Sequence, residues 1–534
     1  LIVIMLILFL SFQSARGVIL PLLSSAISII WVLGIMQLLG FNLDLISSNI
    51  PIVLLAVGSA YTIHVINRVN EEKGKNRKKA LVRALTYITV PVFLSGITTV
   101  FGFSSFIFGA YLTMIRNFGI FTSLGTLFAM IIALVFVPAL VSLFSVYRRK
   151  NTKAKVKKRE NTLMGKWFLM PFSRLIAKHP KYIFAGSLLL ILVSVIGVFQ
   201  IKTSVNMVNY FEKTNSTRIT EDLMQQKFGG SLPVFVVFKG DMQSPEVLNT
   251  MMETEDYMKK YPYVKTTESV ADLIKQMNNV MGEGSKIPNS KLKIQQLWFL
   301  LEGQDIMPQL VTKNLNEGII QSRFGSADSK DMENFVTYMN KFITAHSTKD
   351  CQISLTGMPS VYVRLNNSLV RSQFTSLGLA ILLVIFIVSL VLKSIRKGFY
   401  AAVPIIVTII FLFGFMGYVG IALNVATVLV ASIALGMGID YSIHIITYYY
   451  NDFNETMNVE RSIKNTMMVS GKAIIINVVS VAAGFLVLLF SHIVPIQDFG
   501  LLVALSMVGS GFAALTLLPV ILIMDSRKYL KNTN

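Results

Sequence analysis

A single carboxylate, Asp440, lies in the middle of an apolar run from about Val425 to Tyr449 that is long enough to cross a bilayer. Tyr441 follows it directly, and His444 follows one helical turn later. A bare carboxylate in hydrocarbon is costly, so ionisable groups within spans usually face a bundle interior and mark an ion or substrate path. Aspartate and histidine side chains can take up and release protons, and the stretch therefore predicts proton transfer inside the membrane.

The stretch has a counterpart in the first part of the chain, where Gly58-Ser-Ala-Tyr-Thr-Ile-His64 matches Gly438-Ile-Asp-Tyr-Ser-Ile-His444 at an offset of 380 residues. Further matches follow in the same order at offsets of 381 or 382: Gly102-Phe103 with Gly484-Phe485, Asn117-Phe118-Gly119 with Asp498-Phe499-Gly500, and Pro138 with Pro519. Anchors in one order at nearly one offset indicate two halves that repeat in the same orientation, about an axis along the membrane normal.

The repeat places Ala60 where the second half has Asp440, whereas Tyr61 and His64 are retained. One proton site is therefore expected rather than two. If the repeat axis runs between the two helices, Tyr61 can hydrogen-bond Asp440, and Tyr441 faces Ala60 without a partner.

The next span of each half carries small and hydroxyl side chains on one face. Asn477, Ser480 and Gly484 are spaced i, i+3, i+7. Such faces allow helices to approach closely and to hydrogen-bond one another. The predicted proton relay therefore consists of Asp440, Tyr441, Tyr61, His444, Asn477 and Ser480, with Ala60, His64, Ser95 and Thr98 as the repeat-equivalent positions.

Each of these residues also has a purely structural interpretation. Asp440 could hold the bundle together through a hydrogen bond, and the tyrosines, Asn477 and Ser480 could serve packing alone. His64 and His444 lie about a turn nearer the cytoplasmic surface, and we expect them to be solvated there.

The composition describes an integral membrane protein, since 53% of the 534 residues are hydrophobic and only 14% are charged. The net charge of +21 does not predict nucleic-acid binding, because many Lys and Arg residues lie in a few links between spans. The histidines are scattered, and no metal-ligand spacing, nucleophile with its base, or Gly-Lys-Ser/Thr phosphate loop is found. No cofactor and no enzymatic activity are expected.

About eleven membrane spans are expected from apolar length. Leu1–Leu10 reads as the remnant of one, because the chain begins inside an apolar run and we expect an N-terminal piece to precede it. The others are Gly17–Leu39, Ile46–Ile66, Val90–Phe108, Phe118–Tyr147, Tyr182–Ile201, Ser372–Leu392, Phe399–Val419, Val425–Tyr449, Ala473–Phe490 and Phe499–Met524.

Alternate counting of these spans puts the basic links Arg68–Arg83 and Arg148–Lys181 on one side, which the positive-inside rule makes cytoplasmic. The protein is therefore expected in the cytoplasmic membrane as a multi-pass protein. A long hydrophilic insertion, from about Lys202 to Arg371, falls on the external side by the same count.

Strands are predicted within the insertion at 232–240, 317–323 and 351–355, and helices at 244–261 and 330–345. Strands that alternate with helices indicate an α+β layer of split-βαβ, or ferredoxin-like, type. The expected domains are a first-half bundle (1–147), a basic cytoplasmic linker (148–181), the first helix of the second half (182–201), the external domain (202–371), a second-half bundle (372–525) and a cytoplasmic tail (526–534).

The chain resembles the resistance-nodulation-division (RND) superfamily, and within it the branch of the mycobacterial large membrane proteins and the hopanoid and lipid exporters. The residues that carry the likeness are Gly436-Met-Gly-Ile-Asp-Tyr-Ser-Ile-His444, the matching Gly58–His64, and Gly357-Met-Pro-Ser-Val-Tyr362 before a membrane run. The resemblance implies a first span and a first external domain before Leu1. Relatives carry an Asp-Tyr pair in each half, so Ala60 is a departure from their pattern.

The resemblance also implies proton-driven export of lipids or other amphiphiles, with membrane lipids, a hydrophobic substrate and protons as partners, and with a homo-oligomer or accessory envelope proteins as further options. Members of this family usually employ two carboxylates, whereas this chain has one. The alternative is therefore a non-transporting membrane protein of the same architecture, either sterol-sensing-like or accessory to secretion.

Overall fold

The structure is a computed structural model that describes residues 5, 9, 15–71, 77–144, 169–326 and 328–533. It contains two compact units. The membrane unit comprises Leu1–Lys202 and Leu369–Asn534, and the insert unit comprises Thr203–Ser368.

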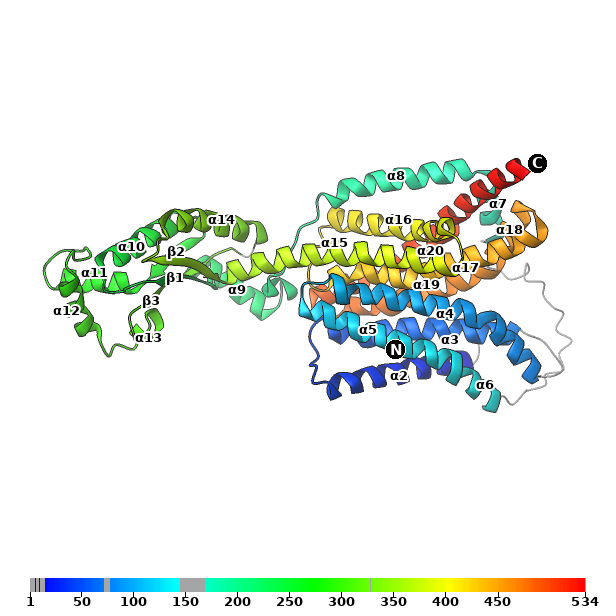
Figure 1. Ribbon diagram of the computed structural model, residues 1–534, viewed down its shortest axis with the longest axis horizontal. Coiled ribbons are helices and arrows are strands. Elements are labelled where there is room, and N and C mark those ends of the chain that lie inside the picture. Colours follow the sequence, from blue (N-terminus) through cyan, green and yellow to red (C-terminus); the bar gives the residue numbers. More distant parts are fainter. Residues whose placement is uncertain are drawn as a thin grey trace. The chain divides into compact units, whose positions relative to one another are not determined.

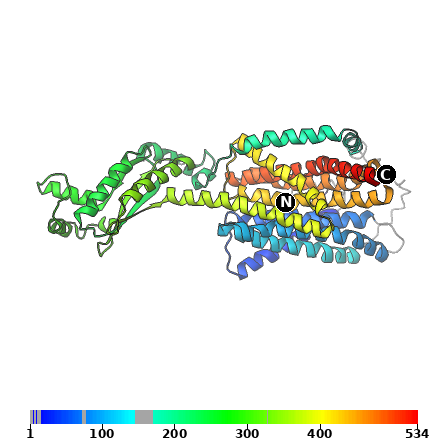
Figure 2. The ribbon, with the colours of Figure 1, turned by 45° about the horizontal axis from the view of Figure 1, so that its top comes forward.

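The helices of the membrane unit run side by side in both ribbon views (Figures 1 and 2). They are α2 (Ala15–Leu38), α3 (Ile50–Glu71), α4 (Arg77–Gly109), α5 (Thr113–Ile131), α6 (Val137–Phe144), α7 (Met170–Lys178), α8 (Pro180–Val198), α15 (Met358–Val391, which begins in the insert unit), α16 (Ile395–Val419), α17 (Val430–Thr456), α18 (Val459–Thr466), α19 (Lys472–Leu486) and α20 (Val494–Thr533).

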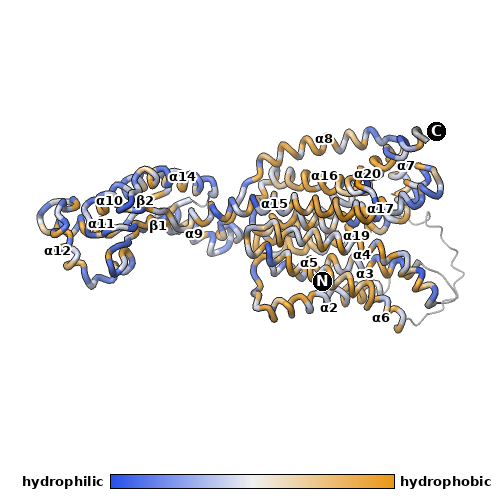
Figure 3. The backbone as a smooth tube through the Cα atoms, viewed as in Figure 1, coloured by the Kyte–Doolittle hydropathy of each residue, from blue (hydrophilic) through white to orange (hydrophobic). Residues whose placement is uncertain are grey.

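Among the described residues, 10 helices are long and apolar enough to cross a membrane, and hydrophobic residues dominate their length in Figure 3. The predicted class of a polytopic helical membrane protein is thereby confirmed. The remnant predicted at Leu1–Leu10 falls almost wholly outside the described residues.

Several helices extend beyond the predicted apolar spans, because hydropathy detects only the apolar part of a helix. The link expected at Arg68–Arg83 is helical over much of its length, since α3 continues to Glu71 and α4 starts at Arg77. Helix α17 likewise continues past Tyr449 to Thr456.

Helix α17 is the centre of the membrane unit. The most apolar window of its span is 94% buried, compared with 11% for α8. Small residues, among them Gly436 and Gly438, let neighbouring helices approach it. A polar side chain on α17 is therefore enclosed by protein, whereas one on α8 would face the surroundings of the bundle.

The two halves begin their central helices with the same turn. Before α3, the Asp44 carboxylate accepts hydrogen bonds from the backbone N–H groups of Ile46 and Ser47. Before α17, the Asn424 side chain accepts from Ala426 and Thr427 in the same way. Asp and Asn both favour such turns through their side-chain oxygen, so the repeat is conserved in geometry although the residue differs.

Helices α4 and α17 join the two halves at close range. A Cβ atom added to Gly102 would lie 3.0 Å from the Cα atom of Gly436, which leaves no room for a larger residue. The hydroxyl of Thr99 donates a hydrogen bond of 2.6 Å to the carbonyl of Gly436 at the same contact. These contacts fix the height of α17, and of its aspartate, against the first half.

The insert unit carries a four-stranded antiparallel sheet in the order β2-β3-β1-β4. Its elements are α9 (Ser216–Phe228), β1 (Leu232–Lys239), α10 (Pro245–Lys259), β2 (Val264–Glu268), α11 (Val270–Val280), α12 (Lys291–Leu301), α13 (Met307–Leu310), β3 (Glu317–Phe324), α14 (Ser329–His346) and β4 (Gln352–Gly357). With α10 and α14 as the crossovers, this is the predicted ferredoxin-like arrangement.

Strand β2 was missing from the sequence expectation. Its residues, Val-Lys-Thr-Thr-Glu, are largely polar and exposed because it is an edge strand. A hydrophobic pattern cannot reveal such a strand.

Replacement of Gly102 by leucine should lower the thermal stability of the solubilised protein, because the side chain would force α4 away from α17 at a cost of about 1–3 kcal/mol. Gly34→Leu on α2 is the matched control, since its added Cβ meets nothing within 4 Å. Scanning fluorimetry compares the midpoints. Equal midpoints for the two variants would contradict the close approach.

Candidate functional site: a buried carboxylate between two histidines

Asp440 lies on α17 with 4% of its surface exposed and contacts two histidines. The Nε2 atom of His444 lies 3.1 Å from Oδ1, and the Nε2 atom of His64 lies 3.5 Å from Oδ2. The two imidazole rings stack with centroids 4.7 Å apart and planes 24° apart. We call Asp440, His64 and His444 the triad.

The internal repeat explains why the triad forms. His444 is four residues from Asp440, so the two side chains share one face of α17. His64 is its repeat equivalent on α3, and a repeat about an axis between the helices brings the two rings together. The triad therefore draws its members from both halves of the membrane unit.

The histidines do not have the solvated interfacial position that we expected. His64 is buried, and the side chain of His444 is 16% exposed. The expectation failed because depth along the helix was considered without the partner helix. The carboxylate and the two imidazoles are close enough for their charges to interact directly.

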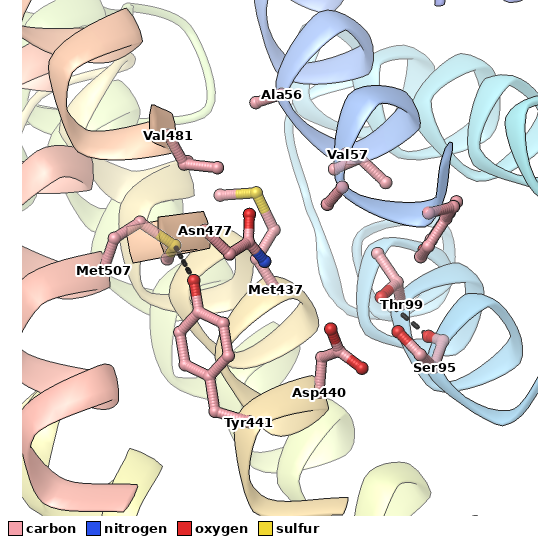
Figure 4. Close-up of a pocket in the computed structure, with 12 residues that line it drawn as sticks. Ala56, Val57, Ser95, Thr99, Met437, Asp440, Tyr441, Asn477, Val481 and Met507 are labelled. Carbon is pink, nitrogen blue, oxygen red and sulfur yellow. Dashed lines mark hydrogen bonds between the residues drawn. The ribbon is translucent and has the colours of Figure 1, made fainter. Parts of the chain in front are cut away.

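A small cavity of about 20 Å³ lies beside Asp440 (Figure 4). This volume is enough for about one water molecule, which needs roughly 10–15 Å³. The predicted relay residues Tyr61, Asp440, Tyr441 and Asn477 line it, together with the repeat-equivalent positions Ala60 and Ser95, and these residues come from the four helices α3, α4, α17 and α19. The structure thus gathers most of the predicted site around one point.

The predicted partnership of Tyr61 with Asp440 is wrong in its detail, because no hydrogen bond joins them although both line this cavity. The Nε2 atoms of His64 and His444 lie next to the two carboxylate oxygens instead. Tyr441 turns toward its own half, where its hydroxyl lies 4.0 Å from the Met507 sulfur (Figure 4).

A larger cavity, of about 640 Å³, begins at the two histidines. Its wall includes Arg68, Tyr87, Asn451 and Lys472, which belong to α3, α4, α17 and α19. Of these two cavities, Asp440 lines the small one and not the large one, and the histidines line the large one and not the small one. The imidazole pair therefore lies between the carboxylate and a polar cavity toward the C-terminal ends of α3 and α17.

The remaining predicted residues are Ser480 and Thr98. Ser480 is buried on α19, and its hydroxyl has no hydrogen-bond partner among the described residues. The Thr98 hydroxyl donates to the carbonyls of Leu94 and Ser95 in its own helix. Its neighbour Thr99, which the sequence comparison did not single out, makes the contact between the halves. Its repeat equivalent is Val481, so no matching hydroxyl pattern drew attention to it.

The triad also has the donor types that metal ions bind. Its ligand atoms all lie within 4.8 Å of one another, a grouping that a search for short sequence spacings could not find because His64 and Asp440 are distant in the chain. A protonated imidazole beside the carboxylate would compensate its charge without a metal ion. We therefore interpret it as an ionisable cluster and not as a set of metal ligands.

The sequence profile of the MMPL family matches residues 1–183 and 215–534. The chain belongs to the MMPL family. MMPL proteins form a family of transporters within the RND superfamily and not a family of enzymes, which confirms the resemblance inferred from the motifs.

Individual relatives cover different shares of the chain. A membrane protein of Methanocaldococcus jannaschii, MJ1562, is 23% identical over 360 residues, which are 64% of this chain and 91% of that protein. The sulfolipid-1 exporter MmpL8 of Mycobacterium tuberculosis is 27% identical over 212 residues, 38% of this chain and 19% of the exporter. A Niemann-Pick type C1-related protein of Plasmodium falciparum is 28% identical over 121 residues, 22% of this chain and 8% of that protein.

Thr99→Val should destabilise the membrane unit by about 1 kcal/mol, because it removes a hydrogen bond between the halves and leaves the Gly436 carbonyl without that donor. Thr98→Val has the same shape change and removes only hydrogen bonds within α4. Thermal unfolding of both variants measures the difference. A larger loss for Thr98→Val would refute the assigned contact.

Proposed function

We propose that this MMPL protein is a proton-driven exporter of lipids or other hydrophobic or amphiphilic molecules, with Asp440 as the proton-carrying residue. The observation that carries the proposal is the triad, a buried acid between imidazoles from both halves of a duplicated bundle. The family supports transport, and the mycobacterial relative named as a sulfolipid-1 exporter supports a lipidic substrate.

The cost of an aspartate in the bilayer and the energy that the transmembrane potential supplies per charge are of comparable size. A central aspartate costs about 2.5–3.5 kcal/mol on insertion scales. Moving one charge through the transmembrane potential supplies about 2.3 kcal/mol per 100 mV. A proton that reaches the triad along the potential can therefore change which pairing of Asp440 with His64 and His444 is favoured.

The repeat creates two equivalent contacts between the halves, which we call the two seams, and a change in their packing could turn the change in charge into motion. On one seam, Thr99 and Gly436 are in contact. On the other, their repeat equivalents Val481 and Ala56 line the small cavity beside Asp440. A change of charge on Asp440 would alter which of the two contacts between the halves is closely packed (tight) and which borders a cavity (loose). This is expected for a bundle with two packed states.

The other relay residues have assigned places in this scheme. Tyr61, Tyr441 and Asn477 surround the small cavity, where one water could link them to the carboxylate. His64 and His444 connect the carboxylate to the large cavity. Ser480 has a packing role or a relay role on α19.

The proposal includes a cytoplasmic membrane location with the insert unit outside, since the basic links fall on the opposite side by span count. The insert unit would then handle substrate on the external side. Assembly into an oligomer, or with accessory envelope proteins, belongs to the same proposal.

Asp440→Asn should abolish proton-driven lipid movement, because the amide cannot carry a proton. Purified protein in vesicles, with an imposed pH gradient, a pH-sensitive dye inside and a labelled lipid, measures both fluxes. Asp44→Asn is the matched control, since Asn424 already forms the same turn in the second half. Chelation of divalent cations should leave transport unchanged.

Full flux in Asp440→Asn, with normal insertion, would disprove the proton assignment. Absence of flux in the native protein under every imposed gradient would favour the alternative of a non-transporting, sterol-sensing-like or secretion-accessory protein. Ala60 in place of a second acid is the observation that favours this alternative.

His64→Asn and His444→Asn should each reduce the proton flux at least about tenfold, because each removes a proton-exchanging ring between Asp440 and the large cavity. His346→Asn in the insert unit is the control, as this histidine is exposed and contacts Phe342. The same vesicle assay applies. Unchanged proton flux in both His64→Asn and His444→Asn would show that the histidines take no part in proton transfer and that Asp440 acts without them.

A further inference from the structure

A basic cavity lies between two short helices of the membrane unit, away from the triad. Helices α7 and α18 line a cavity of about 790 Å³. Its charged lining residues are Arg174, Lys178, Arg461, Lys464 and Glu460. Among the described residues of this wall, one carboxylate thus meets four cations.

The two helices turn their apolar faces inward and their cations outward. Ile176 of α7 and Val459 and Ile463 of α18 belong to one buried core cluster. On the outer side, Arg174 and Lys178 are four residues apart, and Arg461 and Lys464 are three apart. Like charges at these spacings repel one another, so an anion between the helices would stabilise the arrangement.

The polar groups of the wall are suited to an oxyanion. The Arg174 guanidinium donates to the thioether sulfur of Met170 at 3.8 Å, a weak acceptor that a phosphate oxygen would replace. Arginine binds phosphate through two parallel hydrogen bonds, and lysine adds charge. Ser173 and Asn465 also line the wall, but the Ser173 hydroxyl donates to the Met170 carbonyl and the Asn465 amide donates to the Asp452 carboxylate, so recognition rests on the four cations.

The cavity lies at the level where the membrane spans end. Helix α7 ends at Lys178 and the apolar α8 begins at Pro180. Helix α18 forms the start of the candidate span Val459–Phe490, and Arg527 of α20 donates to the Ala177 carbonyl of α7. Figure 1 shows α7, α18 and the end of α20 together at one end of the bundle. A cavity at the end of the spans would lie near the lipid headgroups.

We propose that this cavity binds the headgroup of an anionic phospholipid. The exposed span of α8, which follows α7 directly, offers an apolar surface for the acyl chains, as only 11% of its window is buried. A soluble phosphate has no acyl chain that could bury such a surface. By the positive-inside count the cavity faces the cytoplasmic leaflet, where anionic lipids attract Lys and Arg.

The site is connected to the triad through the backbone. Helix α18 continues through a π-helical segment, Met467–Gly471, into α19, which carries Asn477. The Ser470 hydroxyl of that segment donates to the His444 carbonyl at 3.5 Å. A bound lipid would hold the connection between α17 and α19 in one place. Binding itself does not depend on the proposed proton transport.

The test uses the purified chain in a neutral detergent and native mass spectrometry with dioctanoyl phosphatidylglycerol. We expect this lipid to bind at least about tenfold tighter than dioctanoyl phosphatidylcholine. Arg174→Gln with Arg461→Gln should remove about tenfold of that affinity and leave the phosphatidylcholine affinity unchanged. Arg174→Lys with Arg461→Lys, which keeps the charge, should retain most of it and shows that the helices still fold.

Arg396→Gln with Lys528→Gln is the matched control, since both residues are exposed and removal of their charges leaves the cavity intact. Equal loss of phosphatidylglycerol binding in this control would overturn the site in favour of general surface charge. Equal affinity for the two lipids would also overturn it. So would glycerol 3-phosphate binding as tightly as phosphatidylglycerol, because the ligand would then be a soluble phosphate.

Discussion

A carboxylate removed from water has to be balanced by a nearby charge or by a proton, and this requirement governs the centre of the membrane unit. Asp440 sits on the most enclosed of the described spans and is 4% exposed. His444 of the same helix and His64 of the other half are the side chains close enough to compensate its charge when they carry a proton. Because the compensating groups come from both halves, the charge of one side chain depends on how the halves fit together.

The duplicated bundle is therefore symmetric in form and asymmetric in chemistry. The turns at Asp44 and Asn424 repeat each other in detail. The acid exists in one half only, because Ala60 replaces it in the other. The Thr99 contact with Gly436 likewise has no hydrogen-bonded counterpart, since valine and alanine stand at the equivalent positions. Both differences between the halves, the single acid and the single hydrogen-bonded contact, therefore involve residues of α17.

The sequence predicted what depends on composition and short spacing. Long apolar runs predict spans, and the repeated motif around Asp440 predicts the two halves and the depth of the acid. The contact of His64 with Asp440 could not be predicted from spacing, because it depends on the distance between helices from different halves. The predicted hydrogen bond between Tyr61 and Asp440 was wrong for the same reason. Strand β2 and the polar helix α18 were missed because neither has a long apolar pattern.

The protonation of Asp440 can be observed directly by infrared difference spectroscopy of the protein in lipid, with Asp440→Asn to assign the carboxylic acid band. The account predicts that this band appears and disappears as pH is varied across the range in which lipid movement is driven, and that substitution of His64 shifts the transition. A band that is absent, or constant over that whole range, would contradict a proton-carrying role for Asp440.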